Sequence, residues 1–427
     1  MHQLEATTTK DRIRNFLYEN SIFLVAGSVV ALLWANLDAA WGHDTYNHFM
    51  HFDLRGLFAP IHAEGHGHHG PTFHFLINDV LMALFFAIAA KEVWEAILPG
   101  GALSDIRKAA TPLIATAGGV IGPAVVYLGG TLMLGRWDDL GNGWAVPCAT
   151  DIAFSYLIAK LIFGPGHAAI SFLLLLAIAD DAIGLAILAV FYPTAETNFS
   201  YLLLTATAIG IGLAMRKGKV KNFWWYLMIP GVLSWISFYM SGIHAALGLV
   251  PIIPTLPHAM SDKGLFADDS EQMDTLNQFE HWWKNPVELI LGLFALANAG
   301  VIFSSFGSGT WLVTAGLFVG KPLGIGLFAY GAMRFFKLEL PSGMTMRHVI
   351  VIGCIASFGF TVALFVSTAA FPMPGGIQDS IKMGALISFL APITAFGSAI
   401  LLGIRPVVFG EKRVKAIAPS NAAQAVS

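Results

Sequence analysis

Two adjacent aspartates, Asp180 and Asp181, lie near the centre of a long apolar run over residues 172–192. A run of about 20 apolar residues is long enough to cross a lipid bilayer as a helix. Because a charged side chain at the bilayer centre costs roughly 2.5–3.5 kcal/mol, packing gives no reason to keep two of them side by side. The alternatives are a solvated loop between two short helices, or a neutral aspartate hydrogen-bonded to a neighbour. The pattern favours an intramembrane site for a cation or for protons.

The rest of the chain has the composition of a protein that crosses the membrane many times. Of its 427 residues, 56% are hydrophobic and 12% are charged, and the mean hydropathy is +0.67. Cys148 and Cys354 both lie in apolar segments, so no disulfide framework is predicted. The pair Gly320-Lys321 lacks the upstream glycine of a phosphate-binding loop, which disfavours ATP-driven transport. We expect no cofactor, no nucleotide and no nucleic-acid partner.

Twelve candidate membrane spans divide the chain, and the expected fold is an all-α polytopic membrane protein. Their approximate bounds are 20–37, 73–97, 110–134, 145–163, 170–192, 200–215, 223–240, 242–256, 286–306, 310–333, 347–370 and 381–404. One transmembrane domain is therefore predicted over 20–405, between a polar segment 1–19 and a tail 406–427. A cleaved signal peptide is the alternative for the first apolar run, but a retained span is favoured because the whole chain is membranous.

Lysine and arginine are concentrated in alternate loops. They occur before span one and after spans two, six, ten and twelve, at Lys10, Arg12, Arg14, Arg107, Lys108, Arg216, Lys217, Lys219, Lys221, Arg334, Lys337, Arg347, Arg405, Lys412, Arg413 and Lys415. The loops after the odd-numbered spans hold only Arg55, Arg136 and Lys382. Because positively charged loops stay on the cytoplasmic side, both termini are predicted to be cytoplasmic.

Two long loops have compositions of their own. The outer loop 38–72 is rich in histidine, and its run HAEGHGHHG over 62–70 is typical either of a Zn²⁺ or Ni²⁺ site or of a flexible solvated loop. The cytoplasmic loop 257–285 is acidic. Acidic residues count little in the orientation rule, so this loop does not contradict the predicted sides.

Spans four and eleven carry residues that interrupt a helix. In span four, Pro147 precedes Thr150 and Asp151 by one turn. Broken helices expose backbone groups at membrane depth, where they are tolerated only if they are buried in protein or line a cavity. A pair of interrupted spans in corresponding halves of a chain indicates a transport site, although two glycine-bearing packing helices remain the alternative for span eleven. The interrupting residues of span eleven are Gly353, Ser357, Gly359 and Thr361.

Two further charged residues are predicted inside the membrane. Lys321 lies at the middle of span ten, too deep to reach either surface comfortably, and its expected partner is Asp180 or Asp181. Asp79 in span two is as typical of a helix-end or hydrogen-bonding residue as it is of a residue in the ion site. Two neighbouring acids in a low dielectric do not both ionise easily and titrate as one coupled unit. A monovalent cation that displaces their protons gives exchange by competition, and Thr150 adds an oxygen ligand of the kind that hard cations prefer.

Six short motifs occur in order along the chain. They are ATDIAF at 149–154, AIADDAIGLAI at 177–187, SGIHA at 241–245, FALANAGV at 294–301, VGKPLGIG at 319–326 and GFTVALF at 359–365. Together they resemble the NhaA-type sodium/proton antiporters, over about residues 20–405. The resemblance implies inverted repeats with two crossing discontinuous helices, spans four and eleven. It also implies an electrogenic exchanger of the bacterial inner membrane that expels Na⁺ or Li⁺, admits H⁺ and serves pH homeostasis.

The resemblance implies roles for the intramembrane residues. Asp180 and Asp181 bind the Na⁺ ion and protons in turn. Asp151, with Thr150 beside it, faces positive helix ends, and Lys321 lies by negative ones. The chain is then a transporter and not an enzyme.

The same resemblance assigns Glu92, Glu280 and His281 to a cytoplasmic funnel that responds to pH, and it implies a homodimer. In the family the outer loop forms a β-hairpin at the dimer interface. The outer loop of this chain shows little of the alternation that a strand requires.

The sequence departs from the family near this funnel. Trp94, Glu95 and Ala96 stand where the family has a Lys-Arg pair and a second Glu, and Lys91 replaces an apolar residue. Glu288 in span nine is also unusual. We expect Lys91 and Glu288 to form a buried pair between spans two and nine, with two charges snorkelling to the interface as the alternative.

Two other functions fit parts of the pattern. A sodium-coupled symporter for an organic anion would use the same fold, and substrate-dependent sodium uptake would reveal it. A non-transporting pH sensor or scaffold would use the charges only to set conformation, so Asp180→Asn would alter partner binding and leave vesicle pH gradients unchanged.

Overall fold

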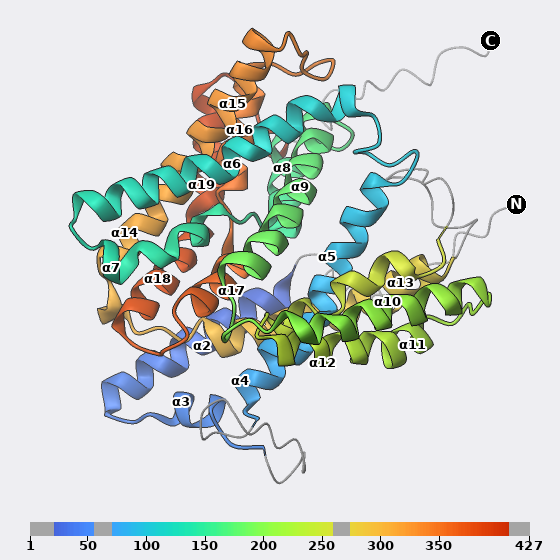
Figure 1. The fold of residues 1–427 in the computed structure, drawn as a ribbon. Helices are drawn as coiled ribbons and strands as arrows, with labels where there is room; N and C mark the ends of the chain where they lie inside the picture. The colour runs from blue at the N-terminus through green and yellow to red at the C-terminus, as the bar shows by residue number, and fades with distance from the viewer. Residues whose placement is uncertain (1–20, 55–70, 259–273, 410–427) are drawn as a thin grey trace, which may run out of the picture.

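The computed structural model describes residues 21–54, 71–258 and 274–409, and these residues are almost entirely helical (Figure 1). The β contact among them is an isolated bridge between Asp53 and Thr72. The all-α class predicted from the apolar runs is therefore confirmed. The helices are α2 (Ile22–Trp41), α3 (Thr45–Met50), α4 (Phe73–Phe75), α5 (Met82–Ile97), α6 (Ile106–Met133), α7 (Trp137–Leu140), α8 (Ile152–Phe163), α9 (Ala168–Phe191), α10 (Leu202–Lys217), α11 (Phe223–Tyr226), α12 (Val232–Ser241), α13 (Thr275–Asn298), α14 (Ser308–Ala315), α15 (Lys321–Phe335), α16 (Met346–Ala356), α17 (Phe360–Ala370), α18 (Gly376–Ile387) and α19 (Ala391–Leu401).

Short π and 3₁₀ segments join or precede several of these helices. The π turns are η1 (Leu76–Leu81), η4 (Leu227–Gly231) and η8 (Gly316–Gly320). The longer 3₁₀ segments are η2 (Gly141–Cys148) and η6 (Val250–Thr255). Single-turn π segments inside helices often accompany functional sites, and η8 ends directly before Lys321.

Seven helices in the described part are long and apolar enough to cross a membrane. They are Ile22–Trp41, Phe73–Ile97, Ala109–Met133, Ala168–Phe191, Phe199–Lys217, Ser308–Phe335 and Gly376–Leu401, and they coincide with predicted spans one, two, three, five, six, ten and twelve. Two bent pairs, η2 with α8 and α16 with α17, raise the number to nine if each pair is one span. Predicted spans seven, eight and nine fall on shorter or more polar helical segments, so the total of twelve stays a prediction.

Helices α6 and α15 pack closely because glycines line their contact. A Cβ atom placed on Gly118 or Gly122 of α6 would overlap the backbone of α15, and one placed on Gly324 would overlap the backbone of α6. Small residues let two membrane helices approach to backbone contact. This packing sets the position of Lys321, which begins α15.

The two broken spans meet at their breaks. The Asp151 N–H donates to the Phe358 carbonyl at 2.8 Å, and the Phe154 ring stacks on that of Phe358 with centroids 4.5 Å apart. The pairs bend by 52° and 53° at these points. A Cβ on Gly359 would overlap the Ala149 carbonyl, so the close approach requires glycine there.

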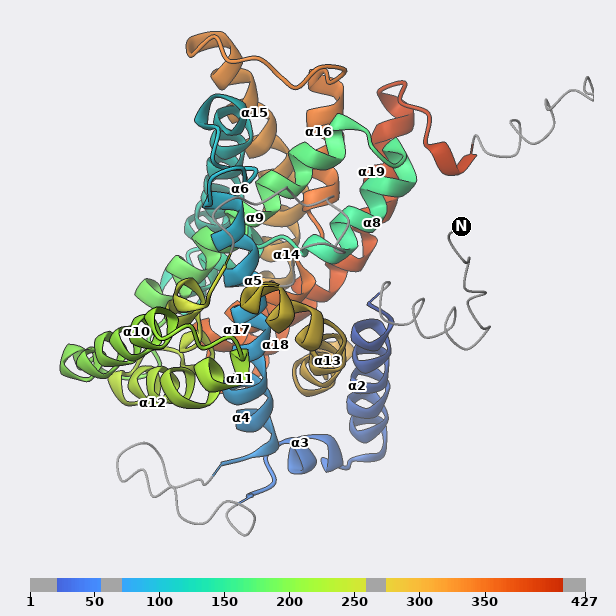
Figure 2. The same cartoon turned by 90° about the vertical axis from the view of Figure 1, so that its right-hand side faces the viewer.

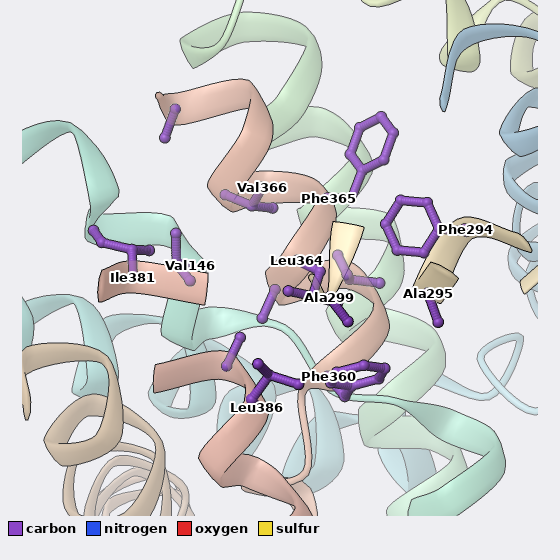
Figure 3. Packing of buried hydrophobic residues seen from close by; sticks show 14 of the residues in the cluster. Val146, Phe294, Ala295, Ala299, Phe360, Leu364, Phe365, Val366, Ile381 and Leu386 are labelled. Carbon is purple, nitrogen blue, oxygen red and sulfur yellow. The ribbon is translucent and has the colours of Figure 1, made fainter. Parts of the chain in front are cut away.

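The largest apolar cluster surrounds α17 (Figure 3). Phe294 of α13 faces Phe365 of α17 with ring centroids 6.1 Å apart, and both rings are buried. Ile381 of α18 and Val146 of η2 close the cluster from the other side. The second half of the broken span eleven is therefore fixed by packing on several elements.

The predicted outer and cytoplasmic segments lie at opposite ends of the molecule. Figure 2 shows α3, from the predicted outer loop, at the lower end and the connection between α15 and α16 at the upper end. The histidine run 62–70, the segment 1–19, most of the acidic loop and the end of the tail lie outside the described residues.

Candidate ion-binding site

Asp180 on α9 is held by two donors from other elements. Thr150 Oγ1 donates to its Oδ2 at 2.6 Å, and Lys321 Nζ donates to the same oxygen at 3.1 Å. Lys321 is fully buried and also donates to the Cys148 carbonyl at 2.5 Å. The structure therefore brings Lys321 to Asp180, one of its two expected partners.

Asp181, the next residue, has a different environment. It makes no hydrogen bond or ion pair with any residue that the structure describes. Together with Asp180 it lines a cavity of about 30 Å³ between α5, α9, α17 and η2. That volume is enough for a water molecule and hence for a small ion. The remaining lining is apolar, and it includes Phe85, Phe86, Leu188, Val362 and Val366.

Asp151 closes the break in span four. Its Oδ1 accepts from the Phe154 N–H at 3.2 Å and caps α8, and its Oδ2 accepts from Thr361 Oγ1 at 2.5 Å. A carboxylate is favourable at a helix N-terminus and a cation at a C-terminus. Lys321 has the opposite position to Asp151, because it bonds the Cys148 carbonyl at the end of η2. Both buried charges therefore meet helix ends of opposite sign.

The expected pair of Lys91 with Glu288 is wrong. Lys91, which is 4% exposed, bonds Glu280 of α13 and Glu95 of its own helix, the latter at 2.6 Å. Glu288 lies eight residues beyond Glu280, about 12 Å further along α13. The last turns of α5 pack beside the start of α13, so Glu280 and not Glu288 is within reach.

The other predicted site residues differ in how close they lie to the tandem aspartates Asp180 and Asp181. Glu92 is half-buried and close enough to Asp181 and Glu280 to act on both electrostatically, whereas His281 is exposed. Asp79 lies in η1, where its backbone carbonyl accepts from the Trp235 indole at 2.8 Å. No interaction that the structure records joins Asp79 to the tandem aspartates.

Sequence reasoning missed two features of the site. The Cys148 carbonyl is the second partner of Lys321, and a backbone group has no signature in a sequence. The three-residue network of Lys91 was also missed, although Glu95 lies at the i+4 position where such pairs form. No cluster of three or more metal-ligating side chains occurs within the described ranges.

The comparisons with known proteins agree with one another. The family model described as "Na+/H+ antiporter 1" matches residues 15–401. The Na⁺/H⁺ antiporter NhaA of Jannaschia sp. (strain CCS1) is 50% identical over 405 residues, which are 88% of this chain and 95% of the relative. The Na⁺/H⁺ antiporter NhaA of Desulfitobacterium hafniense (strain DSM 10664 / DCB-2) is 43% identical over 404 residues, which are 94% of this chain and 98% of the relative.

One of the solved structures that align with the chain covers most of its length. It is the sodium proton antiporter MjNhaP1 from Methanocaldococcus jannaschii at pH 8, with 13% identity and a TM-score of 0.48 over 90% of this chain and 97% of that one. That likeness is too weak to support a conclusion. From the family match over residues 15–401 and the relatives at 50% and 43% identity, the chain belongs to the Na⁺/H⁺ antiporter 1 family.

Proposed function

We propose that the protein exchanges cytoplasmic Na⁺ or Li⁺ for external H⁺ across the bacterial inner membrane, through competition at Asp180 and Asp181. The observation that carries this proposal is the contrast between the two carboxylates. Asp180 is held by a buried lysine, and Asp181 faces a small cavity without a protein partner. A cation or a proton is what an unpartnered carboxylate in an apolar cavity needs.

The proposed exchange follows from the balance of positive and negative charge around Asp180 and Asp181. In the absence of the ion, Lys321 balances Asp180 and a proton neutralises Asp181. When a cation enters the cavity, it displaces the proton and competes with Lys321 for Asp180. Rearrangement of the broken helices then opens the site to the other side, as alternating access requires. If more than one proton returns for each Na⁺, the cycle moves net charge and is electrogenic.

The size of the cavity separates this proposal from a symporter for organic anions. Sites for such molecules measure about 300–1,000 Å³, whereas the cavity that both aspartates line is about 30 Å³. Monovalent metal ions fit that volume and organic anions do not.

The proposed orientation places both termini in the cytoplasm, and the proposed assembly is a homodimer.

Asp181→Asn tests the proposal directly. In everted vesicles we expect the wild type to dissipate a pH gradient on addition of Na⁺ or Li⁺, read by fluorescence dequenching, and Asp181→Asn to give no response. Glu196→Gln makes the same kind of change at an exposed carboxylate between α9 and α10 and should behave as the wild type. Undiminished exchange in Asp181→Asn would contradict the proposal.

Competition also predicts the pH dependence. Because protons and Na⁺ share the carboxylates, the apparent KM for Na⁺ should rise by about tenfold for each pH unit below the apparent pKa of the pair, if one proton competes with one ion. The measurement is the KM for Na⁺ at a series of fixed pH values. A KM that does not change with pH would exclude competition at a shared site.

A further inference from the structure

Glu288 is a half-buried acidic residue that no role described so far requires. It lies near the middle of α13, 13 residues after the start of that helix, or about 20 Å along its axis. Its Oε2 is buried and has no hydrogen-bond partner. The other buried side-chain atoms without a partner among the described residues are neutral: Trp94 Nε1, Ser234 Oγ, His244 Nδ1, Trp283 Nε1 and Ser388 Oγ.

The groups around Glu288 do not neutralise it. The Ser21 hydroxyl at the start of α2 reaches the carboxylate, and Asp151 at the break of span four is close enough to add to its negative potential. Lys284, one turn earlier on α13, attracts it from an exposed position and forms no ion pair with it. The two buried lysines nearest the site are already held, Lys321 by Asp180 and Lys91 by Glu280.

A buried carboxylate oxygen without a hydrogen-bond donor destabilises the fold, because that atom has lost water and has gained no counter-charge. A group of this kind persists where a mobile cation supplies the missing charge. The position suits such a role, since Glu288 lies on α13 eight residues beyond the Lys91–Glu280 contact and is close enough to Asp151 to interact with it electrostatically.

We propose that Glu288 is a transit site for the transported monovalent cation between the cytoplasmic mouth and the Asp180–Asp181 cavity. This inference rests on the proposed exchange function. Oε2 supplies one oxygen ligand to the passing ion and lowers the electrostatic barrier to its entry. Glu288 thus affects how readily the ion reaches the cavity, while Asp180 and Asp181 carry out the exchange itself.

Glu288→Gln tests the inference, because it keeps the shape and removes the charge. In vesicles at fixed alkaline pH we expect the apparent KM for Na⁺ and for Li⁺ to rise about tenfold with a maximal rate near that of the wild type. Glu288→Asp keeps the charge and should restore most of the affinity. Glu196→Gln, at an exposed carboxylate, should leave both constants unchanged. An unchanged KM in Glu288→Gln would overturn the inference.

Thermal unfolding in detergent without Na⁺ gives a second readout. A transit carboxylate costs stability, so Glu288→Gln should melt at the same temperature as the wild type or higher. A clear fall in Tm would show that Glu288 is a structural partner, and this result would also overturn the inference.

Asp181→Asn, measured in the vesicles used for Glu288→Gln, separates the two proposals. If it retains exchange, the proposed function fails; if it is inactive while Glu288→Gln matches the wild type, only the role of Glu288 fails.

Discussion

Polar residues at the centre of this protein are held by specific hydrogen bonds, and Asp151 shows the pattern most clearly. Its two oxygens accept from the Phe154 N–H and from Thr361 Oγ1, so the carboxylate joins α8 to the start of α17. The sequence pattern predicts that Thr361 is one of the residues that interrupt span eleven. Its partner lies 210 positions earlier, and only the tertiary fold brings the two together.

We expect Thr361→Val to destabilise the protein by about 1.5–3 kcal/mol, the range for a hydrogen bond to a charged group. Valine has nearly the same shape but offers no donor to the buried carboxylate. Thermal unfolding in detergent measures the effect. Thr361→Ser keeps the hydroxyl and should lose much less stability. Equal losses in the two variants would show that the methyl group, and not the hydrogen bond, is what matters.

At the scale of elements, the two breaks are the features that organise the site. Each half of span four or eleven is too short to cross a membrane alone, and the halves meet where Asp151 bonds the Phe358 carbonyl. The interruption of span four was predictable from Pro147. The mutual contact was not, because it depends on how α17 packs against α13 and α18.

Gly359→Ala should disrupt this contact. The new Cβ would overlap the Ala149 carbonyl, and neither backbone can move without displacing Asp151. Overpacking of this kind costs about 1–3 kcal/mol, so we expect a lower Tm together with slower exchange. Gly397→Ala on α19 is the matched control, since a Cβ there meets nothing within 4 Å. A Gly359→Ala variant with wild-type Tm and rate would contradict the close approach.

Two histidines cap helices that lead into the site. His167 Nδ1 accepts from the Ala169 N–H at the start of α9, and His348 Nδ1 accepts from the Thr345 N–H at the start of α16. The two rings stack with centroids 5.2 Å apart. Each cap satisfies a backbone N–H at the start of a helix, where no carbonyl of the same helix can accept it.

His167→Ala tests the cap of α9. Alanine offers no acceptor to the Ala169 N–H, so we expect a stability loss of about 1 kcal/mol, read as a lower Tm in detergent. His167→Asn keeps an acceptor at the N-cap and should lose much less. Equal losses in the two variants would show that this hydrogen bond does not stabilise the helix.

At the scale of the whole molecule, charged residues that pair with one another lie in two places, at the buried centre and at one end of the bundle. Asp151, Asp180 and Lys321 occupy the centre, while Lys91 joins α5 to α13 at the end of the bundle that we predict to be cytoplasmic. Glu92 and Glu280, which the family resemblance assigns to one funnel, lie close enough to interact electrostatically, and their role in the response to pH stays a prediction. The partner of Lys91 was mispredicted because two turns of α13 separate Glu280 from Glu288, and the register between two helices is a property of their packing.

Lys91→Met should lower stability by about 1–3 kcal/mol, because it removes the buried cation that Glu280 contacts. The double variant Lys91→Met/Glu280→Gln removes one of the repelling acids and should recover part of the loss. Lys160→Met, at an exposed lysine at the end of α8, is the control. If the effects of Lys91→Met and Glu280→Gln on Tm, measured singly, add up to that of the double variant, this would argue against a direct pair.

The sequence by itself determined the class of this protein, because apolar runs of bilayer length admit few other folds and intramembrane carboxylates are too costly to keep without a use. It also predicts that Asp180, Asp181 and Lys321 lie at mid-depth in the membrane, since each is near the middle of its predicted span. The tertiary structure alone decided which groups meet: Thr150 and Lys321 at Asp180, Thr361 at Asp151, and an open cavity at Asp181. These contacts join residues far apart in the chain, and they depend on helix rotation and close backbone approach, which hydrophobic patterns do not specify.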